Sequence, residues 1–465
     1  MRSSRMTVAM ADERAPVSDD STERPGPAAL GSTGLAGNAL NRELILRREA
    51  HLGGSMLFYR NPVHVVRGEG VWLYDQEGRQ YLDCYNNVAS VGHCHPRVVE
   101  AICRQARLLN THTRYLHEGI VTYAERLAST FPGNLDVCLF VCTGSEANEL
   151  AMRIAQSVTG RTGAVVMENS YHGNSGRTNE LSTCTSKPGS RPAYVAAVEP
   201  PNTYRGPFGP GRPAGAQYAS LVGDAIDQLN DCGCGLAAFL CDSIFDSQGT
   251  LEAPRDYFTD VYRRVRSAGG LCIADEVQAG FARTGTMWGF EHYDVIPDIV
   301  TLGKPIAAGH PVGAVVTRMD ILEQFSKRNL YFNTFGGNPV SAAAGNAVLD
   351  VLEDEALREH VVDVSPYLRA GLLELQQQHQ LIGDVRGRGL FMGLELVVDR
   401  GSKEPERNAA LAVAEAMREH GVLIGVTGRH GNVIKIRPPL PFSRDNVDLL
   451  MDKLDIALSL ATSKT

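Results

Sequence analysis

The sequence predicts an α/β protein, with a large domain built on a mainly parallel seven-stranded sheet and a smaller α+β domain. Three observations favour this class. The chain has 465 residues, of which 43% are hydrophobic and 21% charged, so it is long enough for more than one packed core. Short continuous apolar runs alternate with helical stretches between residues 96 and 340. From residue 341 onward, long helices alternate with a few strands.

The strands of the large domain are predicted from seven apolar runs: CLFVCTG, GAVVMEN, AYVAAVEP, LAAFLCDS, LCIADEV, DIVTLGK and VGAVVTR. Strands that are apolar along their whole length are typical of a parallel sheet covered by helices. Stretches such as SEANELAMRIAQSV and RDYFTDVYRRVRSAGG separate these runs and have helical spacing. Together they indicate a mainly parallel sheet.

The rest of the chain divides into three segments. Residues 1–38 are rich in Ser, Pro, Gly and Ala, which predicts a disordered leader. Residues 39–95 contain alternating apolar and polar positions around glycine turns, which predicts an antiparallel meander that contributes to the small domain. Residues 96–340 form the predicted large domain, and residues 341–465 form the predicted C-terminal small domain.

Charge and cysteine usage exclude several classes of function. The formal net charge is -8 and no long basic run occurs, which argues against nucleic acid or an anionic membrane as the main partner. The ten cysteines are scattered without a recurring ligand spacing, so we expect no metal site and mostly reduced thiols. We find neither a secretory signal nor an apolar run long enough to span a bilayer, and a cytoplasmic location is the default expectation.

A strand, a turn and a helix follow one another in CLFVCTGSEANELAMRIA. The turn Thr143-Gly144-Ser145 precedes a helix that is expected to begin near Glu146. Free backbone N–H groups and the positive end of the helix dipole make such a turn suitable for a phosphate group. Alternatively, Ser145 serves only as the N-cap of the helix.

Two carboxylates, Asp275 and Glu276, end the predicted buried strand LCIADEV. Ligands of parallel sheets bind at this end of the strands, and a buried carboxylate needs a partner. A metal ion, an arginine such as Arg283, or a protonated heterocyclic nitrogen would each serve. A purely structural ion pair is the alternative.

Lys304 follows the predicted strand DIVTLG and lies between Gly303 and Pro305. An amine held there and removed from water has a lowered pKa and becomes a nucleophile, although a single loop lysine is usually solvated. A phosphate-binding turn, an acidic strand end and a lysine on successive strands match pyridoxal phosphate chemistry. In that chemistry the lysine forms a Schiff base, and an anion keeps the pyridine nitrogen protonated.

Residues 53–458 resemble the fold-type I enzymes of the class III aminotransferase family, which depend on pyridoxal phosphate. The segments TGSEAN, YHG, DEVQAGFARTG, TLGKP, TFGGNPV and IRPPL carry the resemblance, in the family's order and spacing. The resemblance implies that Lys304 forms the Schiff base and that Asp275 pairs with the pyridine nitrogen. It also implies that Gln278 lies near the ring hydroxyl and that Tyr171 stacks on the ring.

The same resemblance assigns the phosphate of the cofactor to three residues. Gly144 and Ser145 are expected to bind it from the turn before the helix, and Thr334 is expected to reach it from a neighbouring subunit. The active site would then be shared within a homodimer.

Several segments resemble the ethanolamine-phosphate and phosphohydroxylysine phospho-lyases more than aminotransferases of amino acids or ω-amines. They are YNNVASVGHCHPRVVEA, NTHTRYLHEGIVTYAERL, YFNTFGGNPVSAAAGNAVLDVLE and TLGKPIAAGHPV, although the last has Ala307-Ala308 where the lyases have Gly-Asn. Many transaminases of the family carry a glutamate followed by proline and a second glutamate five positions after the first, which can neutralise the carboxylate-binding arginine when a neutral substrate enters. Here Asp242 and Ser247 stand at those positions.

Arg437 is the substrate-binding arginine that the resemblance implies. Without the second glutamate it would remain available for an anionic substrate group, unless Asp246, next to Ser247, takes the place of the missing partner. Four further residues are candidates for phosphate contact: Arg114, His117, Tyr85 and Asn87.

The sequence thus predicts a phospho-lyase that releases phosphate, ammonia and an aldehyde from O-phosphoethanolamine or a similar small phosphorylated amine. The alternatives are an aminotransferase, a related lyase that releases another group such as a guanidine derivative, and a non-catalytic regulator that binds pyridoxal phosphate. The regulator is disfavoured because Lys304 and Asp275 are both present and no basic helix-turn-helix segment is attached.

Overall fold

The computed structural model describes residues 39–53, 57–186, 189–209 and 214–462. The predicted leader, residues 1–38, lies outside the described residues. Within them, no helix combines the length and the apolar character needed to cross a lipid bilayer.

A seven-stranded sheet forms the centre of the large domain, with the order β4-β10-β9-β8-β7-β5-β6. Its strands are β4 (Val137–Val141), β5 (Gly163–Met167), β6 (Val195–Val198), β7 (Leu236–Asp242), β8 (Leu271–Asp275), β9 (Ile299–Leu302) and β10 (Gly313–Thr317). β10 is antiparallel to β4 and β9, and the other neighbours are parallel. The predicted mainly parallel sheet is therefore confirmed.

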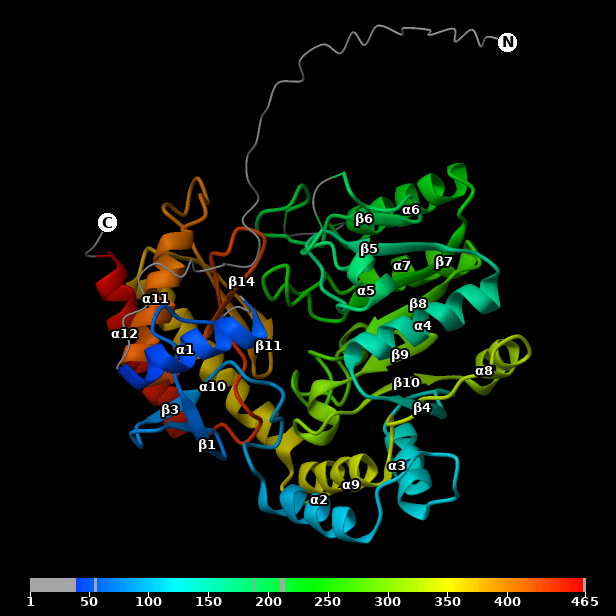
Figure 1. Ribbon diagram of the computed structural model, residues 1–465. Coiled ribbons are helices and arrows are strands. Elements are labelled where there is room, and N and C mark those ends of the chain that lie inside the picture. The colour runs from blue at the N-terminus through cyan, green and yellow to red at the C-terminus, as the bar shows by residue number, and fades with distance from the viewer. Residues whose placement is uncertain (1–38, 54–56, 187–188, 210–213, 463–465) are drawn as a thin grey trace, which may run out of the picture.

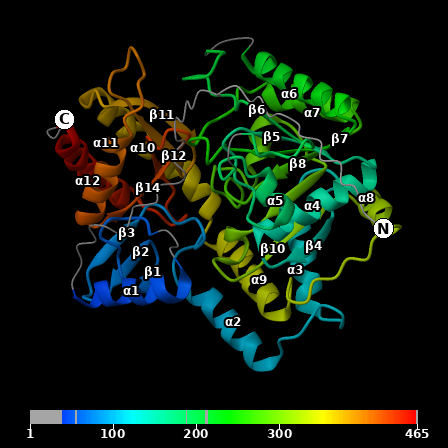
Figure 2. The same ribbon diagram turned by 45° about the horizontal axis from the view of Figure 1, so that its top comes forward.

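Helices cover both faces of this sheet (Figures 1 and 2). They are α4 (Gly144–Thr159), α5 (Gly176–Leu181), α6 (Ala214–Asp231), α7 (Tyr257–Ser267) and α8 (Met319–Ser326). In β7, Phe239 and Cys241 pack with α6 and α7, whereas Ala238 and Leu240 pack with α4 and α8. Because side chains alternate across a strand, a strand between two helical layers is apolar throughout, as the sequence showed.

The smaller domain contains two four-stranded sheets. One is antiparallel, with β11 (Ile382–Arg388), β12 (Phe391–Leu396), β15 (Val433–Ile436) and β14 (Gly425–Thr427). The other has the N-terminal meander β1 (Val65–Glu69), β2 (Trp72–Asp75) and β3 (Gln80–Asp83), completed by β13 (Val422–Leu423). β13 is parallel to β3, so the N-terminal segment pairs directly with the C-terminal part of the chain.

Helices complete the smaller domain and its connection to the large one. They are α1 (Ala39–Leu52), α2 (Pro96–Leu108), α3 (Glu118–Ser129), α9 (Pro339–Asp354), α10 (Leu357–Gln378), α11 (Arg407–Glu419) and α12 (Arg444–Thr462), with two short 3₁₀ turns, η1 (Gly289–Tyr293) and η2 (Lys304–Ala307), in the large domain. α9 packs against α2 and α3 below the large sheet, and α10 continues from it into the smaller domain (Figure 1).

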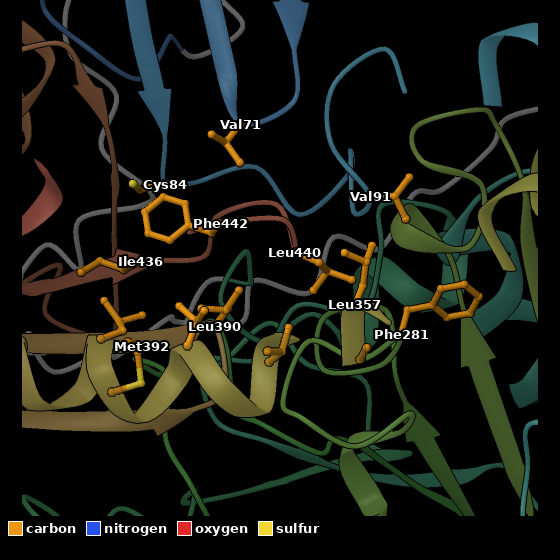
Figure 3. Packing of buried hydrophobic residues seen from close by; sticks show 14 of the residues in the cluster. Val71, Cys84, Val91, Phe281, Leu357, Leu390, Met392, Ile436, Leu440 and Phe442 are labelled. Carbon is orange, nitrogen blue, oxygen red and sulfur yellow. The ribbon is translucent and has the colours of Figure 1, made fainter. Parts of the chain in front are cut away.

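One hydrophobic cluster joins the N-terminal segment, the large domain and the C-terminal part (Figure 3). Val71 and Cys84 meet Ile436 and Phe442 within it, and Phe281 belongs to the same cluster. The backbone N–H of Arg437 donates to the Cys84 carbonyl at 2.6 Å, which ties the end of β15 to the strand β3 region. This packing fixes where the side chain of Arg437 can lie.

Candidate active site

Three polar side chains lie next to one another at the carboxyl ends of three neighbouring parallel strands. Asp242 of β7 is opposite Asp275 of β8, and Asp275 is opposite Thr301 of β9. Gly303 and Lys304 follow directly where β9 ends. Ligands of α/β sheets bind beyond this edge, so the strand order brings the predicted amine and carboxylate to one place.

A cavity of about 300 Å³ opens at this edge of the sheet. Six of the eight predicted site residues line it, namely Lys304, Asp275, Gly144, Ser145, Tyr171 and Gln278. Thr334 and Arg437 are not among its lining residues. Tyr171 is 42% exposed and contributes to the cavity lining. Lys304 and Asp275 therefore share one cavity, as a common cofactor requires.

Asp275 is buried and held by three donors. Its Oδ2 accepts from His172 Nδ1 at 2.9 Å and from Asn148 Nδ2 at 2.8 Å, and its Oδ1 accepts from the backbone N–H of Val277 at 3.2 Å. The Thr301 hydroxyl donates to Asn148 Oδ1 at 2.7 Å and fixes the orientation of that amide. Donors on both oxygens fix the orientation of this carboxylate, which suits a partner that carries a positive charge.

Asp242 lies beside this carboxylate and is hydrogen-bonded by the backbone of Asp246. Its Oδ1 is 3.7 Å from His172 Nδ1. Burial, with the negative charges of Asp275 and Asp246, raises the pKa of Asp242 well above its usual value. These surroundings favour the neutral form of Asp242, whereas the carboxylate of Asp275 accepts three hydrogen bonds.

The amine of Lys304 is buried, and its backbone has an unusual conformation. Burial, followed by the positive charge of Arg437, lowers the pKa of Lys304 below its ordinary value, while Asp275 and Asp246 act in the opposite direction. Its φ is +32°, which a residue with a side chain rarely adopts and which is typical of functional sites. A larger neutral fraction makes this amine a better nucleophile and base.

The helix that faces the cavity begins at Gly144, two residues before the predicted start near Glu146. Its N-cap is Thr143, whose hydroxyl accepts from the Glu146 N–H at 3.1 Å. The alternative in which Ser145 is the N-cap is therefore wrong. The Ser145 hydroxyl lies in the first turn, where it donates to Asn174 Oδ1 at 3.2 Å and lines the cavity. The free N–H groups of this turn suit a phosphate group.

Arg283 and Glu276 take structural roles. The guanidinium of Arg283 donates to the carbonyls of Leu390 and Pro438, so it is not the partner of Asp275. Glu276 accepts from the N–H groups of Gly289 and Phe290 at 2.8 and 3.0 Å, and from the Ser243 hydroxyl. Burial raises the pKa of Glu276 to about 7. Of the two adjacent carboxylates, only Asp275 lines the cavity.

Arg437 is almost fully buried, and Gln278 lies between its guanidinium and the cavity. Its Nη1 donates to Gln278 Oε1 and is 3.5 Å from Asp246 Oδ2, and its Nη2 donates to the Tyr85 carbonyl at 3.3 Å. Asp246 is therefore the carboxylate next to Arg437, which is the alternative that the sequence left open, and the guanidinium is not without a carboxylate partner.

The other candidates for phosphate contact lie in two places. Asn87 donates to Gln278 Oε1 at 2.7 Å, and the ring of Tyr85 lies beside Arg437. Arg114 is exposed and its guanidinium lies 4.0 Å from the centre of the Phe332 ring, outside the cavity of this chain. His117 is the N-cap residue of α3. Of the four candidates, only Asn87 and Tyr85 lie next to Gln278 or Arg437 at the cavity wall.

Sequence reasoning assigned no role to several residues of the site: Asn148, His172, Thr301 and Lys435. Asn148 lies four positions after Gly144 on the same helix face, and His172 belongs to the segment YHG. Lys435 precedes Arg437 by two positions, so both side chains lie on one face of the strand. The spacings of Asn148 and Lys435 were therefore the sequence signals that could have identified these two residues as part of the site.

The residues around the cavity fit pyridoxal phosphate. An amine, a carboxyl group, an aromatic ring and a helix N-terminus line a single space. The Nε2 atom of His172 is buried without a hydrogen-bond partner, although its Nδ1 is held by Asp275. Lys304, Asp275 and Tyr171 would hold the ring, and Gly144 and Ser145 would hold the phosphate.

Comparisons with known proteins agree with this geometry. A relative from Drosophila melanogaster, named alanine–glyoxylate aminotransferase 2-like, is 44% identical over 418 residues, which cover 87% of this chain and 85% of the relative. The ethanolamine-phosphate phospho-lyase homolog 1 of Caenorhabditis elegans is 40% identical over 437 residues, which cover 90% and 93%.

Similarity to a solved structure extends over the whole fold. A phospholyase from Arthrobacter, solved in complex with phosphoethanolamine, is 44% identical to this chain with a TM-score of 0.87. The similarity covers 90% of this chain and 99% of that one. Residues 58–458 match the family Aminotransferase class-III. The chain therefore belongs to the class III aminotransferase family of fold-type I enzymes, and its cofactor is pyridoxal phosphate.

Proposed function

We propose that the protein is a pyridoxal phosphate-dependent phospho-lyase that acts on O-phosphoethanolamine or a similar small phosphorylated amine. The products are an aldehyde, ammonia and phosphate. One observation carries the proposal: Lys304 and Asp275 share a cavity whose wall residue, Gln278, is bonded to the buried guanidinium of Arg437. The similarity to the phospholyase solved with phosphoethanolamine supports the choice of substrate.

Lys304 first holds the cofactor and then moves a proton. When bound, the cofactor takes up the electron pair that remains after the carbon next to the substrate nitrogen loses its proton. Lys304 would hold the cofactor until the substrate amine takes its place, and its freed Nζ would then accept that proton. Burial lowers the pKa of this amine, which raises the fraction that can act as a base. Asp275, held by His172 and Asn148, would pair with the ring nitrogen of the bound cofactor.

The leaving group departs from the next carbon. Its C–O bond breaks, and the phosphate leaves with the electron pair of that bond. Negative charge grows on the phosphate oxygens, and a cation fixed near them lowers the barrier. Arg437 is already held in place by Gln278 and the Tyr85 carbonyl. The remaining two-carbon fragment reacts with water to give acetaldehyde and ammonia.

An aminotransferase that uses an amine or amino acid and a 2-keto acid is the second candidate. The contact of Asp246 with Arg437 favours it, because this carboxylate neutralises the guanidinium when a neutral substrate is present. The relative named alanine–glyoxylate aminotransferase 2-like also supports it. The two candidates share the first proton transfer to Lys304 and differ in what leaves the substrate.

We expect the purified holoenzyme to release phosphate and acetaldehyde in equal amounts from O-phosphoethanolamine without any keto acid. Phosphate is measured with a molybdate assay and acetaldehyde with alcohol dehydrogenase and NADH. The absorbance of the bound cofactor should return to its starting form after each turnover, because elimination leaves no amino group on it.

Ethanolamine serves as the matched control, since it lacks only the phosphate and should give no aldehyde. Turnover that appears only with pyruvate or 2-oxoglutarate, with the cofactor converted to its amine form, would instead establish the aminotransferase. The lyase proposal would then be wrong.

We also propose that two copies of the chain form a homodimer with a shared active site. Thr334 is exposed in this chain. Large exposed apolar side chains lie on the loop before α9, at the end of α2 and on the segment between α2 and α3: Leu108, Leu109, Tyr115, Leu116, Leu330, Phe332 and Phe335. Apolar surface of this extent supports a protein interface, and a second copy would bring Thr334 to the cavity of its partner.

Leu116→Asp is expected to separate the dimer, because the Leu116 side chain is fully exposed in one chain and a carboxylate is costly to bury. Light scattering after size exclusion should give twice the 50.3 kDa of one chain for the unmodified protein. The variant should give the mass of one chain and should retain less cofactor. Val398→Asp, also an exposed apolar position, is the control and should remain dimeric. A monomeric unmodified protein would refute the proposal.

A further inference from the structure

A second buried cation lies beside Arg437. Lys435 is in β15, between β12 and β14. Ile434 and Ile436 point into the hydrophobic cluster, so Lys435 and Arg437 point to the opposite face of the strand. Both cations lie beside the ring of Tyr85, with Lys435 Nζ at 5.1 Å from its centre and the Arg437 guanidinium at 5.6 Å.

The carboxylate of Asp246 lies close to both Lys435 and Arg437. Lys435 Nζ is 3.2 Å from Asp246 Oδ1 and 3.4 Å from Oδ2, and Arg437 Nη1 is 3.5 Å from Oδ2. All three side chains are at least nine-tenths buried. Two buried basic side chains therefore face a single carboxylate within this cluster. An anionic group placed within reach of both would gain a second cationic partner that Asp246 alone has to share between them.

The cluster of Lys435, Arg437 and Asp246 adjoins the cavity of the active site. Gln278 lines that cavity, and its Nε2 donates to Asp246 Oδ2 at 2.9 Å while its Oε1 accepts from Arg437. Gln278 therefore separates the cluster from the space that holds Lys304. A change in the side-chain conformations of Gln278 and Asp246 would expose both cations to a substrate group in the cavity.

We propose that Lys435 and Arg437 together bind the phosphate of the substrate, and that Asp246 occupies this place when no anion is bound. The proposal rests on the proposed function, and it names the residues that select a phosphate. The contacts of Asp246 demonstrate that one anionic group reaches both cations at once. Lys435 would act as a binding residue and take no part in proton transfer.

The two cations also explain how a phosphate would be preferred over a carboxylate. The two oxygens of a carboxylate satisfy one guanidinium in a bidentate contact. A phosphate has a third oxygen, and near neutral pH it carries nearly two negative charges. Lys435 supplies a partner for this oxygen and for the additional charge. Loss of Lys435 should therefore weaken phosphate binding much more than carboxylate binding.

The test measures anion binding to the holoenzyme by isothermal titration calorimetry at constant ionic strength. The probes are inorganic phosphate and acetate, and the proteins are the unmodified enzyme, Lys435→Met, Lys435→Arg and Asp246→Asn. In Lys435→Met, the Kd for phosphate should rise at least about tenfold, as expected for one charge-assisted hydrogen bond, and the Kd for acetate should change much less. Lys435→Arg should keep most of the phosphate affinity. Asp246→Asn should bind both anions more tightly, because the competing carboxylate is gone.

Lys327→Met, at an exposed lysine of α8's C-terminus, is the matched control and should bind both anions as the unmodified enzyme does. Equal weakening of phosphate and acetate in Lys435→Met, or no change in either, would overturn the proposal. If Lys435→Met does not fold, weaker phosphate binding in Asp246→Asn would overturn it instead. Lys435-dependent phosphate binding without phosphate release from O-phosphoethanolamine would leave this anion site standing and reject the lyase.

Discussion

Replacing Lys304 by alanine is expected to abolish the lyase reaction, with the rate of phosphate release falling by at least about 10⁴-fold. The residue has two tasks, since its Nζ both binds the cofactor and accepts the substrate proton. No other amine lines the cavity among the described residues, so none replaces it. The visible absorbance band of the lysine-bound cofactor should also disappear, which gives a readout that does not depend on turnover.

The control for this experiment is Lys327→Ala, because that lysine is exposed and remote from the cavity lining. It should keep both the absorbance band and the rate. An unchanged band in Lys304→Ala would mean that another group binds the cofactor. A retained rate would mean that the proton goes elsewhere, and either result would contradict the role of Lys304.

The large sheet was predictable because its strands are buried on both faces. Each of the seven apolar runs forms a strand. A strand between two helical layers is apolar on both faces, so it is recognised in the sequence as a continuous apolar run. The direction of β10 was not predictable by the same reasoning. Its residues Gly313–Thr317 are buried throughout, and a strand that is apolar on both faces carries no periodic signal for parallel or antiparallel pairing.

The site was predictable where chemistry follows directly from a strand end. Asp275 and Lys304 end neighbouring strands, so their meeting follows from topology. Lys435 and the contact between Asp246 and Arg437 depend on distant segments. Asp246 lies after β7 and is 189 positions from Lys435. A lysine inside a strand indicates a solvent-facing position by default, so only the packed structure reveals that Lys435 is buried beside an arginine.

Replacing Asp275 by asparagine should slow phosphate release by about 10³-fold, close to the cost of removing a preorganised charge partner from a buried site. Asparagine keeps the size of the side chain, and its oxygen can still accept from His172 and Asn148. It removes the negative charge that stabilises a protonated ring nitrogen. The rate is to be measured in single turnovers at saturating cofactor, so that weaker cofactor binding does not account for the loss.

Asp242→Asn is the matched control, because the two carboxyls are neighbours at the ends of β7 and β8. Burial and the charge of Asp275 raise the pKa of Asp242, which favours its neutral form, so asparagine is expected to change the charge less at this position than at Asp275. Its rate should therefore stay within about tenfold of the unmodified enzyme, a small fraction of the loss at Asp275. If Asp242→Asn caused the larger loss, the negative charge under the cofactor ring would belong to Asp242, and the assignment of the two carboxyls would have to be exchanged.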